Sequence, residues 1–247
     1  MSRAFEELAH ETTPMGEISL RRRLEPTLKV DVFEVKLDDE FLMSSLFTTG
    51  ELAVAELGLA ALEGEQLDVV IGGLGLGYTA RAALLDPRVR SIKVIEALAE
   101  VIDWHRRHLV PLGAELTDDP RCELVHGDFF AMVAAGLETT DQGPTRFDAI
   151  LVDIDHTPRH LLNASHAGFY EPSGLRRLAE QLRPGGVFAL WSDDPPDEQF
   201  LAVMLDEFAR VHAHVVTFPN FYTGEHASST VYVAVADDRS RPPTANE

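Results

Sequence analysis

The stretch LDVVIGGLGLGYTARAALLDPRVRSIKVIE, residues 67–96, decides the fold of this chain. Its first part, Leu67 to Ile71, is too short and too rich in Val and Ile for a helix, which predicts a buried parallel strand. A glycine cluster follows, then a helical segment from Tyr78 to Leu85, then a second apolar strand from Ile92 to Ile95 that Glu96 ends. This order of strand, glycine-rich turn, helix and strand is typical of a nucleotide-binding βαβ unit.

The glycines and the acid at the end of the second strand are the candidate ligand contacts. Gly72, Gly73, Gly75 and Gly77 permit a tight turn with positive φ and a close approach of the backbone to a ligand. Glu96 lies roughly 20 residues beyond them, the separation at which such a unit presents a carboxylate to ribose hydroxyls. A tight turn with an incidental acid is the simpler interpretation of the glycines alone. The whole pattern favours nucleoside binding by these five residues.

The spacing also limits which nucleoside can bind. A dinucleotide fingerprint requires Gly or Ala three residues after Gly75, where Tyr78 stands, and no Gly-Lys-Ser/Thr follows, which excludes a phosphate-binding P-loop. A glycine loop without the dinucleotide spacing suits an adenosine with a small charged sulfonium tail better than a pyrophosphate.

The composition narrows the class of protein. The chain has 247 residues, of which 45% are hydrophobic and 25% charged, as in ordinary globular domains. Its formal net charge of −20 argues against a nucleic-acid partner, which needs basic patches, and would suit a cationic small molecule. The single cysteine excludes an internal disulfide framework. Because no apolar run reaches the length of a membrane span and no signal-peptide pattern is present, we expect a cytoplasmic protein without a membrane partner.

The remaining segments predict two domains and two terminal extensions. Residues 1–15 are polar with weak helical spacing, which indicates a mobile arm or a short docking helix. Residues 16–47 alternate in polarity and predict a small β-rich domain of antiparallel strands. Residues 48–236 alternate strand and helix and end on an alternating pair, which predicts a Rossmann-like α/β domain with a seven-stranded, mostly parallel sheet and an antiparallel C-terminal hairpin. Residues 237–247 are polar and predict a disordered tail.

Capping residues predict three helix boundaries. We expect Thr49 to cap a helix from Gly50 to Leu62. We expect Ser173 to cap a helix that continues to Leu182 and ends at the Pro-Gly-Gly that follows. Pro196 is expected to begin a helix that reaches Val211.

Polar residues follow the third and fourth strands of the predicted sheet. Asp128 comes after the third strand, where it could also cap the next helix. Asp153, Asp155 and His156 leave the fourth strand, and residues 159–168 follow as a lid or gate loop. Since open α/β sheets bind ligands outside the carboxyl ends of their strands, we expect these side chains to face the ligand, although Asp153 could equally cap its own loop.

Two patterns raise the question of a metal. His105 and His108 lie one helical turn apart, but the two arginines between them favour a solvated face over a ligand pair. Asp153, Asp155 and His156 could form part of a divalent-cation site, because carboxylate oxygens and imidazole nitrogens are common ligands of such ions. No further ligand is identified, so no metal is expected.

The sequence context resembles the spermidine synthase family, a branch of the S-adenosylmethionine methyltransferase superfold. The resemblance rests on IGG-x-G-x-GYT followed by VIEALAEVIDWHRRHL and extends from about Val30 to Val235. It implies a small N-terminal β-domain, a homodimer, and a donor that is S-adenosylmethionine or its decarboxylated form. It also implies that Asp128 accepts a hydrogen bond from the adenine amino group and that Asp153, which matches the first acid of the family's DSxD motif, is the catalytic acid.

Three departures from the family pattern leave the reaction open. Gly75 stands where the family's GGGDG has the Asp that holds the donor's amine, and its Tyr-His-Glu before the first long helix appears as residues 43–45, Met-Ser-Ser. The second loop acid is His156, with Asp155 one position early. We expect a transferase that moves an aminopropyl or methyl group to a small acceptor such as an amine. The alternatives are a methyltransferase of unknown substrate and a non-catalytic nucleoside-binding homologue.

Overall fold

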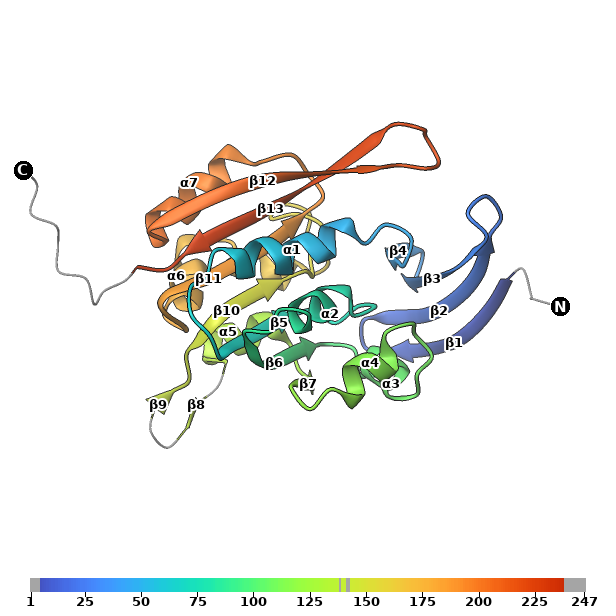
Figure 1. Cartoon of the computed structure of the whole chain (residues 1–247), viewed down its shortest axis with the longest axis horizontal. Coiled ribbons are helices and arrows are strands. Elements are labelled where there is room, and N and C mark those ends of the chain that lie inside the picture. Colours follow the sequence, from blue (N-terminus) through green and yellow to red (C-terminus); the bar gives the residue numbers. More distant parts are fainter. Residues whose placement is uncertain (1–4, 138, 141–142, 238–247) are drawn as a thin grey trace, which may run out of the picture.

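A seven-stranded sheet forms the centre of the computed structural model, which describes residues 5–137, 139–140 and 143–237 (Figure 1). Its strands are β5 (Leu67–Gly72), β6 (Val89–Glu96), β7 (Cys122–His126), β10 (Phe147–Val152), β11 (Leu182–Ser192), β12 (Arg210–Pro219) and β13 (His226–Val235). They lie in the order β12-β13-β11-β10-β5-β6-β7. Strands β11, β10, β5, β6 and β7 are mutually parallel, whereas the hairpin β12–β13 is antiparallel. The predicted α/β fold is confirmed.

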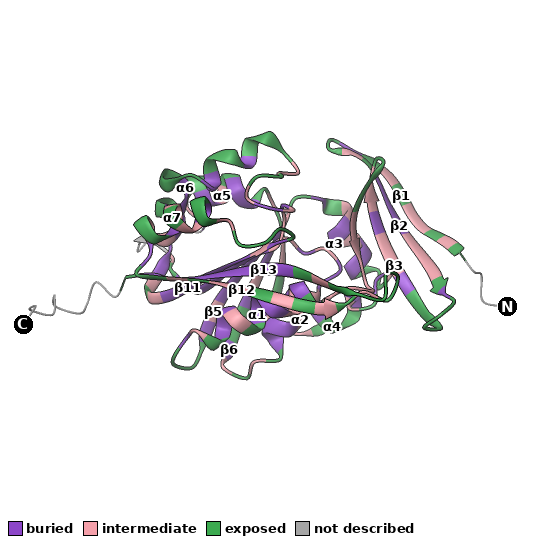
Figure 2. Cartoon of the chain, turned by 90° about the horizontal axis from the view of Figure 1, so that it is seen from above, coloured by how far each residue is buried: buried purple, intermediate pink, exposed green. Residues whose placement is uncertain are grey.

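Helices cover both faces of this sheet (Figure 2). One face carries α1 (Thr49–Ala60), α2 (Tyr78–Leu84), α3 (Ala99–Arg106) and α4 (Gly113–Asp118). The other carries α5 (Phe129–Ala135), α6 (Pro172–Ala179), α7 (Glu198–Glu207) and the 3₁₀ turn η1 (Ala164–Phe169). Val70 and Ile71, neighbours on β5, pack into different apolar clusters on the two faces. This burial on both sides explains why the strand is a continuous apolar run.

A second sheet stands at the N-terminal end of the molecule (Figure 1). It is an antiparallel meander of β1 (Phe5–Thr13), β2 (Gly16–Glu25), β3 (Val30–Leu37) and β4 (Glu40–Ser44). The expectation of a mobile arm over residues 1–15 is wrong for the described part, because Phe5–Thr13 pairs with β2 along its whole length. The indole Nε1 of Trp104 also donates to Glu11 Oε1 (3.2 Å), which fixes this strand to α3. Most of the expected tail, residues 238–247, lies outside the described residues.

Several helix ends differ from the sequence-based expectation. Helix α1 begins after Thr48, and no side chain caps it. The helix expected from Ser173 ends at Ala179, because Leu182 to Ser192 continue as β11, in which Leu182 pairs with the first residue of β10. Helix α7 begins two residues after Pro196, because the side chain of Asp197 accepts hydrogen bonds from the backbone N–H groups of the first turn.

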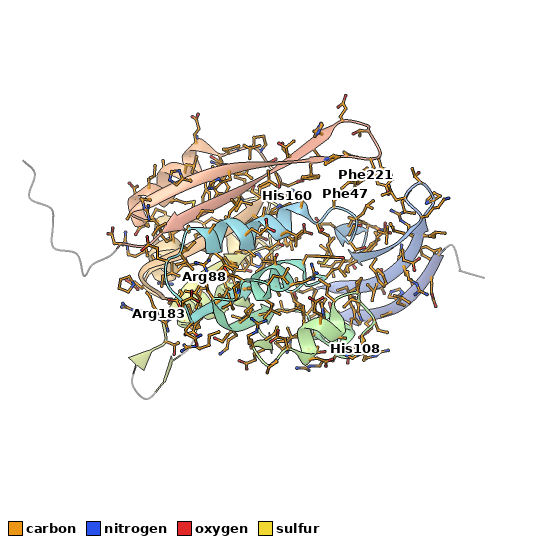
Figure 3. All side chains as sticks on the ribbon, in the orientation of Figure 1. Phe47, Arg88, His108, His160, Arg183 and Phe221 are labelled. Carbon is orange, nitrogen blue, oxygen red and sulfur yellow. The ribbon has the colours of Figure 1, made fainter. Side chains whose placement is uncertain are left out.

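The C-terminal hairpin extends past the edge of the central sheet toward the N-terminal sheet (Figure 1). At its tip the hydroxyl of Tyr222 donates to Glu25 Oε2 (3.1 Å) and accepts from Arg23 Nη2 (2.9 Å). Phe221 stacks on Phe47, with ring centroids 6.1 Å apart (Figure 3). The hairpin therefore joins the two sheets across the space between them. Within the described residues, no helix has the length and apolar character needed to cross a lipid bilayer.

Candidate active site

A cavity of about 720 Å³ lies where the carboxyl ends of the parallel strands meet the N-terminal sheet. Strands β5 and β10 are neighbours here although the chain leaves them for opposite edges of the sheet, which is the topological switch point where open α/β sheets bind ligands. The predicted site residues that line the cavity are Gly73, Gly75, Gly77, Glu96, Asp128, Asp153 and His156.

The glycine loop between β5 and α2 forms one wall of the cavity. Gly73, Gly75 and Gly77 have positive φ angles of 92°, 50° and 92°, so the predicted conformational need for glycine is met at all three. Gly72 does not line the cavity, because it ends β5 and packs under Phe129, whose ring lies 2.8 Å from where a Cβ would stand. Its glycine is required by packing rather than by a ligand.

His105 is hydrogen-bonded to the backbone of this loop. The expectation that His105 lies on a solvated face is wrong, since its side chain is fully buried, whereas His108 is exposed. Burial lowers the pKa of His105, which favours the neutral imidazole, and its Nε2–H donates to the carbonyl oxygen of Gly75 (2.9 Å). The helical spacing gave no sign of this contact, because the partner lies 30 residues away in the chain.

Glu96 ends β6 with its carboxylate beside the glycine loop. Its Oε2 accepts from the backbone N–H of Leu74 (2.9 Å) and its Oε1 from that of Leu98 (2.9 Å). Burial raises the pKa of Glu96, and the surrounding backbone N–H groups oppose that rise. The backbone N–H groups of Gly75 and Ala97 also lie near this carboxylate, but only those of Leu74 and Leu98 are at full hydrogen-bond geometry. Since a carboxylate offers about four acceptor positions, those not used by Leu74 and Leu98 are the ones open to ribose hydroxyls.

Asp128 caps α5 and also lines the cavity. Its Oδ1 accepts from the backbone N–H of Ala131 (3.1 Å), as expected for an N-cap residue, and its side chain is exposed. The capping and ligand-facing roles that the sequence left open are compatible at this position.

Asp153 and Glu51 form a carboxyl pair on the cavity wall. Thr79 Oγ1 donates to Asp153 Oδ2 (3.0 Å), and burial raises the pKa of Asp153 to about 6. Burial, and then the charge of Asp153, raise the pKa of Glu51 to about 8. A negative charge on Asp153 therefore disfavours ionisation of the nearby Glu51 carboxyl. Sequence reasoning missed Glu51; its available signal was an acid in the first turn of the first long helix.

Asp155 and His156, in the loop after β10, point to different surroundings. Asp155 is buried behind the cavity wall and is not part of its lining, contrary to the expectation that it faces the ligand. His156 lines the cavity, and its Nε2 lies 3.1 Å from Glu40 Oε1. The side chains of Asp153, Asp155 and His156 thus have different partners, and no group of three or more potential metal ligands occurs among the described residues.

The cavity is acidic. Of the described residues that line it, none is Lys or Arg, and the acids are Glu51, Glu96, Asp128, Asp153 and Asp193. Low-dielectric walls with charges of one sign concentrate ligands of the opposite sign. The cavity is therefore suited to a cationic ligand.

A model of the spermine/spermidine synthase domain matches residues 51–240, which include the glycine loop and all of these acids. The chain belongs to the spermine/spermidine synthase family. Polyamine aminopropyltransferase 2 of Pseudomonas aeruginosa is 31% identical over 167 residues, covering 64% of this chain and 44% of that protein. Putrescine N-methyltransferase 2 of Nicotiana tabacum is 31% identical over 134 residues, covering 54% of this chain and 34% of that protein. The chain thus spans about half the length, or less, of these curated relatives.

Solved spermidine synthases have the same fold. The structure of spermidine synthase in complex with the transition state analogue AdoDATO has a TM-score of 0.72 and 18% identity, covering 95% of this chain and 75% of that one. The Thermotoga maritima spermidine synthase has a TM-score of 0.70 at 18% identity, with the same coverage.

The structure shows what surrounds two of the positions at which the chain departs from the spermidine synthase pattern. A Cβ added at Gly75 would stand 2.8 Å from Met43 Sδ, so the thioether occupies the space that a side chain at position 75 would need. The family's Tyr-His-Glu was matched to residues 43–45, which carry no acid, yet Glu51 brings a carboxylate to the cavity from the first turn of α1.

Replacing Glu51 by Gln should stabilise the protein increasingly as pH rises. A carboxyl whose folded pKa exceeds its unfolded value binds more protons in the folded state, so its contribution to stability falls between about pH 4.5 and about pH 8. Gln does not ionise, so the variant does not lose this stability as pH rises. Allowing for partial exposure, we expect a gain on the order of 2 kcal/mol in the free energy of unfolding at about pH 9, and little gain at about pH 5.

Urea unfolding of the wild type and the variant at both pH values measures this effect. Glu56→Gln on the same helix is the matched control, because Glu56 is exposed. Parallel pH profiles for wild type and Glu51→Gln would show that the pKa of Glu51 is not raised in the folded protein.

Proposed function

We propose that this protein is an alkyl transferase that takes its alkyl group from a sulfonium nucleoside of the S-adenosylmethionine type and adds it to an amine. The observation that carries the proposal is the Glu51–Asp153 carboxyl pair on the wall of the cavity that also contains the glycine loop. Family membership supports it, since relatives include aminopropyltransferases and N-methyltransferases.

The donor nucleoside fits one side of this cavity. Glu96 has acceptor capacity for the ribose hydroxyls, Asp128 can accept from the adenine amino group, and Gly73 to Gly77 allow the backbone to approach the sulfonium. The acidic lining favours the positive charge on sulfur.

The reaction is a displacement at a carbon bonded to sulfur. The amine lone pair forms the new C–N bond, the C–S bond breaks, and its electron pair returns to sulfur, which leaves as a neutral thioether. Near neutral pH Asp153 is ionised and Glu51 is protonated, given pKa values raised to about 6 and about 8. Asp153 can therefore attract an ammonium group, accept its proton, and stabilise the cationic transition state.

The tail of the donor decides whether aminopropyl or methyl is transferred. Gly75 and Met43 provide no charge for the amine of a decarboxylated donor, a loss worth about 1.5–3 kcal/mol. The acidic lining, in turn, provides no Lys or Arg among the described residues for the carboxylate of ordinary S-adenosylmethionine. These effects oppose each other, so neither donor should be strongly preferred.

We expect S-adenosylmethionine and its decarboxylated form to bind with affinities within about tenfold of each other. Calorimetry with both donors and methylthioadenosine, run in parallel, measures this. A preference for the decarboxylated form of about a hundredfold or more would show that another acid holds its amine. Failure of all three nucleosides to bind would overturn the proposed function.

A further inference from the structure

Asp155 holds the loop that follows the fourth parallel strand. Its carboxylate is fully buried and accepts hydrogen bonds from three points of the loop: the backbone N–H of Leu162 (2.7 Å), Nδ1–H of His166 (2.9 Å) and the hydroxyl of Tyr170 (2.9 Å). A buried carboxylate with this many donors fixes the groups around it in one arrangement. Among these groups, the His166 ring is the one with a free polar atom.

The His166 ring is held between this carboxylate and the cavity. It stacks on Phe130, with centroids 4.0 Å apart and the planes inclined by 28°, and it belongs to the cavity lining. Because Nδ1 donates to Asp155, the neutral ring has an acceptor lone pair at Nε2. Among the described residues His166 Nε2 has no hydrogen-bond partner. It is also not among the fully buried polar atoms, so it is accessible from the cavity.

The position of the ring indicates which part of a ligand it meets. Phe130 lies in the first turn of α5, two residues after Asp128, which caps that helix. His166 and Asp128 therefore flank the same end of the cavity, the end at which the proposed function places the adenine. An exocyclic amino group has two hydrogens, and one acceptor satisfies only one of them.

We propose that His166 Nε2 accepts the second hydrogen of the adenine amino group, with Asp155 as the positioning residue that fixes the tautomer. The inference rests on the proposed function. Two acceptors facing one amino group would reject a nucleoside that carries a carbonyl there, because its oxygen would meet lone pairs.

The test is a ratio of affinities. Calorimetry measures binding of methylthioadenosine and of methylthioinosine, in which a carbonyl replaces the amino group, to each variant. His166→Phe keeps a ring for the stack on Phe130 and removes the acceptor. It should lower the adenosine-to-inosine ratio by about fivefold to tenfold. His160→Phe, the same substitution at an exposed position of the same loop, should leave the ratio unchanged.

Further variants separate recognition from packing. His166→Gln places an acceptor within reach of the same point and should restore part of the ratio. Asp155→Asn keeps the ring but permits the tautomer with a proton on Nε2, so the ratio should fall as in His166→Phe. Because each ratio is taken within one variant, a general loss of stability cancels. Binding with an unchanged ratio in His166→Phe overturns this inference alone, whereas binding of neither nucleoside by the wild type overturns the proposed function with it.

Discussion

Replacing Asp153 by Asn should lower turnover by about a hundredfold or more and leave the affinity for methylthioadenosine within about twofold. In the proposed reaction the carboxylate acts on the incoming amine: it attracts the ammonium, accepts its proton, and faces the positive charge of the transition state. The amide of Asn has nearly the same shape as the carboxylate and can still accept the hydrogen bond from Thr79 Oγ1, which lies 3.0 Å from Asp153 Oδ2 in the wild type. It cannot accept the proton of the amine. The loss should therefore appear in turnover rather than in nucleoside binding.

Turnover as a function of pH gives a second readout for Asp153. Because its pKa is raised to about 6, activity in the wild type should rise as pH increases through that value, when the carboxyl loses its proton. The variant should lack this rise. Asp118→Asn, at an exposed position, is the matched control and should behave as the wild type. Near-normal turnover in Asp153→Asn would assign the proton transfer to Glu51 or to water.

The sequence predicted the parts of the fold that depend on local signals. The run Leu67–Glu96 carries a strand, a glycine turn, a helix and a strand in positions close to those observed, because buried parallel strands need apolar residues on both faces and the turn needs glycine. Asp153, expected to leave the fourth parallel strand, does follow β10, which ends at Val152. These features are set by neighbours in the chain.

Long-range contacts determine what the sequence did not predict. Residues 5–13 are polar and have no strong pattern, and they form a strand because β2 and the indole of Trp104 offer partners. Asp155 was expected in the cavity, but His166 and Tyr170, which lie 11 and 15 residues further on, draw its carboxylate behind the wall. The chain bends from Asp155 onward, and the spacing of residues in such a loop does not show which distant partner a side chain meets.

Glu51 illustrates the same limit at the candidate site. The sequence comparison placed the family's Tyr-His-Glu at Met43-Ser44-Ser45, which carry no acid, and did not single out Glu51, which lies in the first turn of α1 and lines the cavity. Its raised pKa depends on burial and on Asp153, which lies about a hundred residues further along the chain. A sequence can indicate where a helix begins, but it does not show which distant side chain lies near that helix N-terminus.

The ribose contact proposed for Glu96 leads to the second large effect. The carboxylate accepts from the backbone N–H groups of Leu74 and Leu98, so it both orders the glycine loop and presents its remaining lone pairs to the cavity. A charge-assisted hydrogen bond is worth about 1.5–3 kcal/mol. Its loss corresponds to at least tenfold in affinity.

Replacing Glu96 by Ala should therefore weaken methylthioadenosine binding at least tenfold while the protein remains folded, because the carboxylate lies at the end of a strand whose core residues are unchanged. Calorimetry measures the affinity, and thermal unfolding checks the fold. Glu96→Gln keeps one oxygen acceptor and should fall between wild type and Glu96→Ala; Glu63→Ala, at an exposed position, should bind as the wild type does. If Glu96→Ala binds as tightly as the wild type, the ribose is held elsewhere and Glu96 serves the glycine loop alone.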